Sequence, residues 1–228
     1  MDTAVEMDTA VFSRWIGEVV TAVHAGREWL TRLDTAIGDA DHGANLDRGF
    51  EAVSRALADG PPGSPGALLG LVGSTLIRKV GGASGPLYGT AFREAGKVLG
   101  DAPEVSLADL AKALEAGLAG VQRLGAAVEG DKTMVDALAP AVRALARAVR
   151  EGGGRPEALG AAASAARAGA EATIPMQARR GRASYLGPRS VGHEDPGAAS
   201  TALILTALCA AAASPGGPAG DAGPEGTE

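Results

Sequence analysis

Apolar residues recur every three or four positions along most of this chain, and runs in which apolar and polar residues alternate are scarce. In the first such stretch, about residues 8–33, this spacing places Phe12, Ile16 and Val19 on one face. A period near 3.6 residues is typical of amphipathic helices, whereas half-buried strands repeat every second residue. The pattern therefore predicts an all-α protein.

Turn and capping residues divide this pattern into eight helices. Ser106 and Thr133 can accept hydrogen bonds from the free amides of a first turn, and Pro156 suits a helix start. The expected helices cover about residues 8–33, 43–59, 65–79, 87–99, 107–124, 134–151, 156–173 and 196–213. Apart from a loop over 174–194 the links are short, which predicts an antiparallel bundle or a closed helical barrel.

The two ends of the chain are expected to lie outside a helical domain at 8–213. Residues 214–228 are mainly Gly, Pro and Ala, a composition that buries too little apolar surface to order itself. We expect disorder there and over residues 1–7. Because the sequence Met-Asp-Thr-Ala-Val occurs twice near the start, translation can begin at Met1 or at Met7.

Composition narrows the setting and the partners. The 228 residues suffice for one domain with a sizeable core, and the net charge of −6 argues against nucleic acid as the main partner, because phosphate backbones are bound by basic surfaces. The single cysteine, Cys209, excludes a disulfide within the chain and favours a cytoplasmic location. No uninterrupted apolar run approaches about eighteen residues and the N-terminus is acidic, so neither a membrane span nor a secretory signal is expected.

Residues 34–45 carry the most chemical information, because Asp34, Asp39 and Asp41 crowd together between the first two helices. Carboxylates this close repel one another unless a cation lies between them, and oxygen ligands favour magnesium or calcium over zinc. His42 is therefore expected to contact phosphate rather than metal. The helix that follows presents free amides, which suit a phosphate beside the metal. A solvated acidic turn is the alternative on this segment alone.

Two known motifs do not fit. Counted from Asp39, the loop has Ala44 and Phe50 where a calcium-binding EF-hand needs a glycine and a bidentate glutamate. Residues 130–133, Gly-Asp-Lys-Thr, look like the end of a P-loop, but the inserted aspartate and the helical pattern before it exclude that motif. These residues are expected to cap the sixth helix instead.

Three further segments are candidate ligand contacts. Residues 81–86, Gly-Gly-Ala-Ser-Gly-Pro, form a second anion-friendly turn that opens a helix, although a plain loop would look the same. Residues 179–185 contain three arginines. The alternatives for this segment are a solvated loop, a phosphate clamp and a docking surface for an acidic partner. Residues 195–197 are either a helix cap or backbone that lies against a ligand. Without hydrolytic or zinc motifs, metal and phosphate binding remain, which is most of what phosphoryl transfer needs.

Five of these motifs occur in the order seen in one family. They are Asp34-x4-Asp39-x-Asp41-His42-Gly43 and residues 81–90, 130–134, 181–187 and 195–197. Over about residues 8–213 the chain resembles the L subunit of dihydroxyacetone kinase. This resemblance implies a barrel of eight antiparallel helices with the nucleotide held at one end.

The resemblance also implies the ligands and the residues that hold them. Asp34, Asp39 and Asp41 would coordinate two Mg²⁺ ions that bridge the phosphates of ADP or ATP. The residues expected around the nucleotide are His42, Gly43, Ala44, Asn45, Ala83, Ser84, Gly125, Met134, Arg182, Asp195, Pro196 and Gly197, with Met134 near the base.

A mechanism and partners follow from the same resemblance. In the phosphotransferase-linked type, bound ADP is rephosphorylated by a phosphohistidine protein, the M subunit, and the γ-phosphoryl group passes to dihydroxyacetone held on a separate K subunit. Nothing in this chain resembles the K domain, which favours this type over ATP-dependent relatives whose domains are usually fused. The alternatives are an ATP-dependent kinase subunit for dihydroxyacetone, another small ketose or a fatty acyl substrate, and a regulatory module whose nucleotide state is read by a transcription factor. A homodimer is compatible with each of these.

Overall fold

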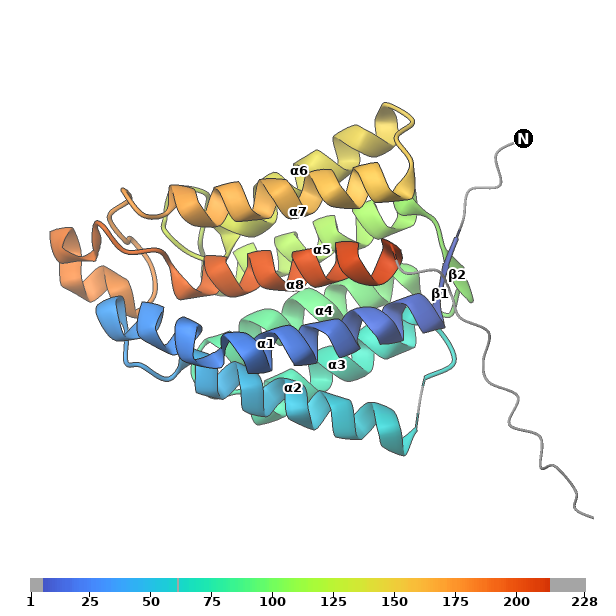
Figure 1. Cartoon of the computed structure of the whole chain (residues 1–228), viewed down its shortest axis with the longest axis horizontal. Helices are drawn as coiled ribbons and strands as arrows, with labels where there is room; N and C mark the ends of the chain where they lie inside the picture. Colours follow the sequence, from blue (N-terminus) through green and yellow to red (C-terminus); the bar gives the residue numbers. More distant parts are fainter. Residues whose placement is uncertain (1–5, 61, 214–228) are drawn as a thin grey trace, which may run out of the picture.

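The computed structural model describes residues 6–60 and 62–213 (Figure 1). These residues form the helices α1 (Thr9–Ile37), α2 (His42–Asp59), α3 (Pro65–Lys79), α4 (Ser84–Leu99), α5 (Leu107–Gly125), α6 (Val135–Arg150), α7 (Arg155–Ala172) and α8 (Pro196–Ala213), the 3-10 segment η1 (Arg182–Ser190), and the strands β1 (Met7–Asp8) and β2 (Glu104–Val105). The prediction of a mainly helical protein is confirmed. The disorder expected over 214–228 lies outside the described residues.

Two boundaries differ from those expected. Helix α1 runs four residues beyond position 33 and ends at the C-cap Gly38, because no helix-breaking residue precedes that glycine. Asp34 therefore belongs to the last turn of α1 instead of a loop. At the other end, Met7 is fully buried and pairs with Val105 in the β1–β2 ribbon, so the folded domain includes Met7, which was expected to be disordered.

Two of the predicted capping residues accept hydrogen bonds from main-chain amides at helix starts. Ser106 accepts a hydrogen bond from the amide of Asp109 (3.1 Å), as expected for the cap of α5. The hydroxyl of Thr133 accepts one from the amide of Val135 at the start of α6 (3.2 Å). These contacts satisfy amides that have no partner within the first turn.

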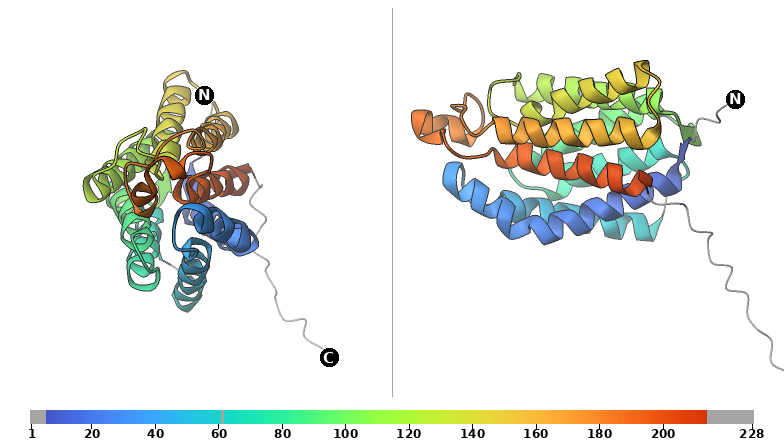
Figure 2. Two further views of the ribbon diagram at one scale, coloured as in Figure 1. Left: turned by 90° about the vertical axis from the view of Figure 1, so that its left-hand side faces the viewer. Right: turned by 45° about the horizontal axis from the view of Figure 1, so that its top comes forward.

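The helices pack in chain order. Each of them contacts the next one along the chain, and α8 packs back against α1. Figure 1 shows the helices lying lengthwise side by side, and the right-hand view of Figure 2 shows η1 at one end and the β1–β2 ribbon at the other. Connections between successive helices therefore gather at the two ends of the molecule.

A small aromatic cluster lies in a core that is built mainly from Leu, Val and Ala. The ring of Trp15 packs against Phe12 and Phe92 at centroid distances of 5.9 and 5.8 Å, and its indole nitrogen donates to the carbonyl of Ile204 (3.0 Å). This bond joins α1 to α8. Among the described helices, α8 alone is long and apolar enough to cross a membrane by length and composition, and 61 % of it is buried inside the protein, as in a core helix.

Candidate functional site

A cavity of about 270 Å³ opens at the end of the molecule that carries η1. Four connections line it, those between α1 and α2, α3 and α4, α5 and α6, and α7 and α8. Twelve of the fifteen residues predicted to bind metal or nucleotide are among its lining residues, namely Asp34, Asp39, Asp41, His42, Ala83, Ser84, Gly125, Met134, Arg182, Asp195, Pro196 and Gly197. Segments far apart in the sequence thus meet at one cavity.

The three carboxylates form one cluster at the wall of this cavity. One oxygen from each of Asp34, Asp39 and Asp41 can be chosen so that all lie within 4.8 Å of one another. Asp34 is buried, and its Oδ2 accepts hydrogen bonds from the amides of Asp41 (2.8 Å) and His42 (3.1 Å). Its position is therefore fixed by the start of α2.

Gly38 is required for this arrangement. A Cβ atom at this position would lie 1.9 Å from Oδ1 of Asp34, which no side chain allows. The turn also holds Ala40 at a φ of 62°, a left-handed conformation that L residues rarely adopt. The backbone here is shaped to bring the carboxylates together.

The donor set of this cluster fits a hard divalent cation. Magnesium prefers carboxylate oxygens, and three of them converge here without a histidine or cysteine ligand. The guanidinium of Arg182 lies 2.8 Å from Oδ2 of Asp39 and forms an ion pair with the cluster. Arg182 also lines the cavity, so it is placed beside both the acidic cluster and any ligand there.

His42 lies under the cavity in a network of hydroxyl groups. Its Nδ1 is 3.2 Å from Oγ of Ser84, and its Nε2 is 2.9 Å from Oγ of Ser200. Burial lowers the pKa of His42, although Asp34 and Asp41 raise it. A neutral imidazole held between two hydroxyls orients Ser84 at the cavity and leaves neither ring nitrogen unpartnered.

Tyr88 continues this network and was not predicted from the sequence. Its hydroxyl donates to the carbonyl of Gly197 (2.9 Å) and lies 2.7 Å from Oγ of Ser200 and 3.0 Å from Oγ1 of Thr201. Burial raises the pKa of Tyr88 to about 12, so the hydroxyl keeps its proton. It joins α4 to the first turn of α8, and no local sequence motif predicts this contact.

Three predicted residues do not line the cavity. Gly43 packs on α1, where a Cβ atom would lie 2.1 Å from the carbonyl of Arg27. Ala44 lies near Arg27 on the outer side of the same turn. The side chain of Asn45 accepts a hydrogen bond from Arg48 (2.6 Å). Their observed contacts support the packing of α2.

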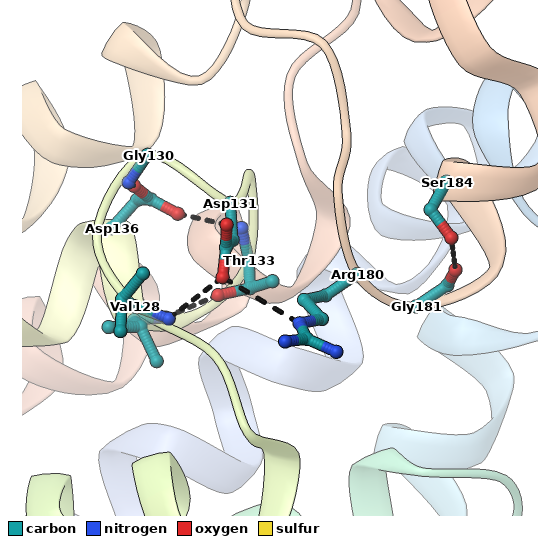
Figure 3. A network of polar contacts seen from close by, with 9 residues as sticks. Val128, Gly130, Asp131, Thr133, Asp136, Arg180, Gly181 and Ser184 are labelled. Atoms are coloured by element: carbon teal, nitrogen blue, oxygen red, sulfur yellow. Dashed lines mark hydrogen bonds and ion pairs between the residues drawn. The ribbon is translucent and has the colours of Figure 1, made fainter.

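The loop before α6 is folded by two aspartates (Figure 3). The carboxylate of Asp136 accepts hydrogen bonds from the amides of Gly130 (2.5 Å) and Thr133 (2.8 Å). That of Asp131 accepts one from the amide of Val128 (2.9 Å) and lies 3.8 Å from Arg180. This loop places Met134 in the cavity wall.

Asp195 is a buried acid that lines the cavity at the start of α8. Its Oδ2 accepts a hydrogen bond from the amide of Ala198 (2.8 Å), so Asp195 caps α8. Burial is the main reason that its pKa is raised, and the charge of Asp136 adds to this effect, whereas the amides of Ala198 and Gly197 and the charge of Lys132 lower it; the net pKa is about 7. Arg180, from the arginine-rich segment 179–185, also lines the cavity. Lys132 lines it too and was not predicted, because nothing in the sequence marks this lysine as buried.

A second group of potential metal ligands lies away from this cavity. His24, Asp47 and Glu51 come close together on α1 and α2. Asp47 is already engaged by His24 (3.0 Å) and by Arg27 (3.5 Å). These contacts account for the buried carboxylate, so the group reads as an ion-pair network between two helices.

Comparison with known proteins places this geometry in context. A family model described as the DAK2 domain matches residues 36–210. The ADP-binding subunit DhaL of the PEP-dependent dihydroxyacetone kinase of Escherichia coli (strain K12) is 45 % identical over 185 residues, which are 81 % of this chain and 88 % of that protein. The L-erythrulose 1-kinase of Mycolicibacterium smegmatis is 41 % identical over 181 residues, which are 78 % of this chain and 31 % of that protein.

A solved structure shares the fold. The dihydroxyacetone kinase from C. freundii, in complex with AMP-PNP and Mg²⁺, superimposes with a TM-score of 0.69 at 28 % sequence identity. The match covers 92 % of this chain and 36 % of that one, so the chain spans about a third of the solved kinase.

Proposed function

The chain belongs to the DAK2 domain family, and we propose that it is the ADP-binding subunit of a phosphoenolpyruvate-dependent dihydroxyacetone kinase. The observation that carries this proposal is the cluster of Asp34, Asp39 and Asp41 at the cavity where four helix connections meet. The subunit would transfer a phosphoryl group through bound ADP and ATP to dihydroxyacetone on a separate subunit.

The acidic cluster is the proposed site for Mg²⁺. Asp34, Asp39 and Asp41 would hold two ions, which would supply neutralisation of charge on the nucleotide phosphates. Asp34 is the most rigid of the three, since two amides fix its carboxylate. A fixed ligand preorganises the site, so less ordering is needed when the metal and nucleotide bind.

The neighbouring residues are proposed to hold the nucleotide. The first turn of α2 and the α4 start at Ala83 and Ser84 would bind phosphates, because both present main-chain amides at a helix N-terminus. Arg182 would stabilise negative charge that develops during transfer. Gly125, Met134 and the turn from Asp195 to Gly197 would line the rest of the nucleotide, with Met134 near the base.

We also propose that the eight helices close into an antiparallel barrel with the nucleotide at one end. Two observations support this arrangement. Each helix contacts the next and α8 contacts α1. Alternate connections line the cavity, while the α4–α5 connection carries β2, which pairs with β1 ahead of α1.

The proposed partners are a K subunit that holds dihydroxyacetone and an M-type phosphohistidine protein as the donor. The subunit names of the relatives and the good coverage of DhaL favour this arrangement. A cytoplasmic location follows from the same proposal. The L-erythrulose kinase relative favours a second candidate, in which the same site serves a different small ketose that the partner selects.

The test is reconstitution. The purified chain is expected to carry ADP and magnesium and, when mixed with its K subunit, to phosphorylate dihydroxyacetone only when a phosphoenolpyruvate relay is supplied. Equal rates with ATP alone would assign the donor to ATP. A chain that retains no nucleotide and supports transfer from neither donor would refute the proposed function. Parallel assays with erythrulose distinguish the second candidate.

A further inference from the structure

Lys132 has an environment unlike that of any other basic residue in the described part of the chain. It is 1 % exposed and is the only lysine or arginine there that is fully buried. The other lysines, Lys79, Lys97 and Lys112, are exposed. Burying a charged ammonium is costly unless its donors are satisfied, so its contacts need an explanation.

The ammonium group of Lys132 has three carbonyl acceptors. It donates to the main-chain oxygens of Thr173 (2.8 Å), Met176 (3.1 Å) and His193. An ammonium has three donors, so each of them is used. The carboxyl group of Asp195 is close enough to interact electrostatically with Lys132.

Residues 174–194, between α7 and α8, form an excursion of the chain whose two ends come together at a neck. The three acceptors lie on both sides of this neck. Two main-chain amides also close the neck: that of Asp195 donates to the side-chain Oγ1 of Thr173 (2.9 Å), and that of Gly192 donates to the carbonyl of Ile174 (2.8 Å). Lys132 reaches this neck from the loop before α6. It therefore joins three parts of the chain at one point.

The joined parts all contribute to the cavity wall. The 174–194 excursion brings Arg180 and Arg182 to the cavity, and the loop that carries Lys132 brings Met134. The amide of Arg179 donates to the carbonyl of Asp131 (3.0 Å), which fixes the two segments a second time. Lys132 itself keeps a φ of 61°, a left-handed conformation unusual for lysine, and this backbone directs its side chain inward.

We propose that Lys132 is a positioning residue that clasps the neck of the 174–194 excursion and so holds Arg182 and the start of α8 against the nucleotide. This inference rests on the proposed function of the cavity. A compact ammonium with rotatable donors matches three converging carbonyls, whereas a planar guanidinium or an apolar side chain does not. Lys132 is not itself expected to take part in the transfer of the phosphoryl group.

The first test compares Lys132→Met with the control Lys112→Met, which changes an exposed lysine. An arginine-specific protease is the probe, because the excursion carries several exposed arginines. Replacing a lysine neither adds nor removes a cleavage site for this protease. We expect cleavage within residues 179–189 to be at least about tenfold faster in Lys132→Met, and Mg²⁺–ADP affinity to fall by about tenfold. The control should stay within about twofold of the parent on both measures. Parent-like protease resistance and affinity in Lys132→Met would overturn the proposal.

A double-mutant cycle separates positioning from general loss of stability. If Lys132 acts through the excursion, its substitution should cost less ADP affinity in an Arg182→Ala background than in the parent. In a Ser84→Ala background, on the α4 side of the cavity, the cost should be unchanged. Equal costs in both backgrounds would contradict a role through Arg182.

A measurement on the unaltered protein covers the case in which Lys132→Met does not fold. Brief acetylation followed by mass spectrometry should label Lys79, Lys97 and Lys112 at least about tenfold faster than Lys132. Labelling of Lys132 at a similar rate would refute the clasp. Since protease resistance and labelling need no nucleotide, they can support the clasp even if the parent protein fails to bind ADP, which would refute the proposed function alone.

Discussion

Single residues at the acidic cluster are held by the local backbone. Two amides at the start of α2 bind Oδ2 of Asp34, and the missing side chain of Gly38 leaves room for its other oxygen. Asp39 is less constrained, with 35 % of its side chain exposed and Arg182 as its partner. Asp39 is therefore the member of the cluster that can be changed with the least damage to the fold.

Substituting Asp39 tests the metal assignment. Asp39→Asn removes a charged oxygen ligand but keeps the shape, so we expect ADP affinity in the presence of magnesium to fall by about tenfold or more. Asp101→Asn, at an exposed position outside the cavity lining, is the matched control and should leave affinity unchanged. Calorimetric titration compares the two. Similar affinities for both variants would count against Asp39 as a ligand.

Asp195 predicts a dependence of stability on pH. Its pKa is raised from 3.8 to about 7, so between these values the folded protein holds a proton that the unfolded chain has released. Stability from this group is therefore greatest at low pH and declines as the pH rises through that window, by up to about 4 kcal/mol. Asp195→Asn lacks this decline, so its melting temperature relative to the parent should rise between pH 5 and pH 8.

The nucleotide-free protein is the sample for this comparison, because ADP would add its own linkage to the melting temperature. Asn can still cap α8, which preserves the contact with Ala198. A difference in melting temperature that is the same at both pH values would contradict the raised pKa.

Site residues that are close together in the sequence could be predicted, whereas contacts between residues far apart in the sequence could not. The close spacing of the carboxylates at 34, 39 and 41 predicts a shared site, and all three line the cavity. The buried state of Lys132 and the contacts of Tyr88 depend on segments 41 to 113 positions away, which no local pattern encodes. Gly43 and Asn45 belong to the same motif, and their contacts with α1 and with Arg48 could not be read from the sequence.

Among the elements, α3 and α4 form an unusually close pair. A Cβ atom on Gly73 would lie 2.4 Å from the carbonyl of Gly89, and one on Gly96 would lie 2.6 Å from that of Gly66. Glycines on both helices thus let the two backbones approach. The pair matters for the site because α4 begins at Ser84.

This packing gives a prediction with an internal control. Gly73→Ala should lower the free energy of unfolding by roughly 1–3 kcal/mol, because the methyl group meets backbone that cannot move aside. Gly70→Ala lies on the same helix with nothing within 4 Å and should be neutral or stabilise by up to about 1 kcal/mol. Urea denaturation measures both. A tolerated Gly73→Ala would mean that the helices are not in backbone contact.

The long helices could be predicted from the sequence, whereas the short strands and η1 could not. The helices follow from period and capping, and Ser106 is bonded as its position predicts. The strands β1 and β2 have two residues each, too few for any alternation to be seen. Segment η1 has nine residues, is broken at Gly187, where φ is 56°, and has Pro188 directly after the break, so no continuous helix was expected there. Both are specified by what they pack against.

For the whole molecule, the order of packing explains why the site is at one end. Helix connections alternate between the two ends, so motifs that begin 47 to 51 positions apart along the chain arrive at one cavity. The opposite end holds the β1–β2 ribbon and carries no predicted ligand. A partner that delivers or accepts a phosphoryl group is therefore expected to approach the end with η1.

Titration of the purified, nucleotide-stripped protein with ADP, in magnesium and again in EDTA, is the most direct test of a carboxylate-held metal and nucleotide site. The account predicts one ADP per chain with magnesium, and binding that is at least about tenfold weaker when the metal is removed, because the phosphates then face the acidic cluster without a cation between them. ADP that binds equally well in EDTA, or not at all in magnesium, would contradict it.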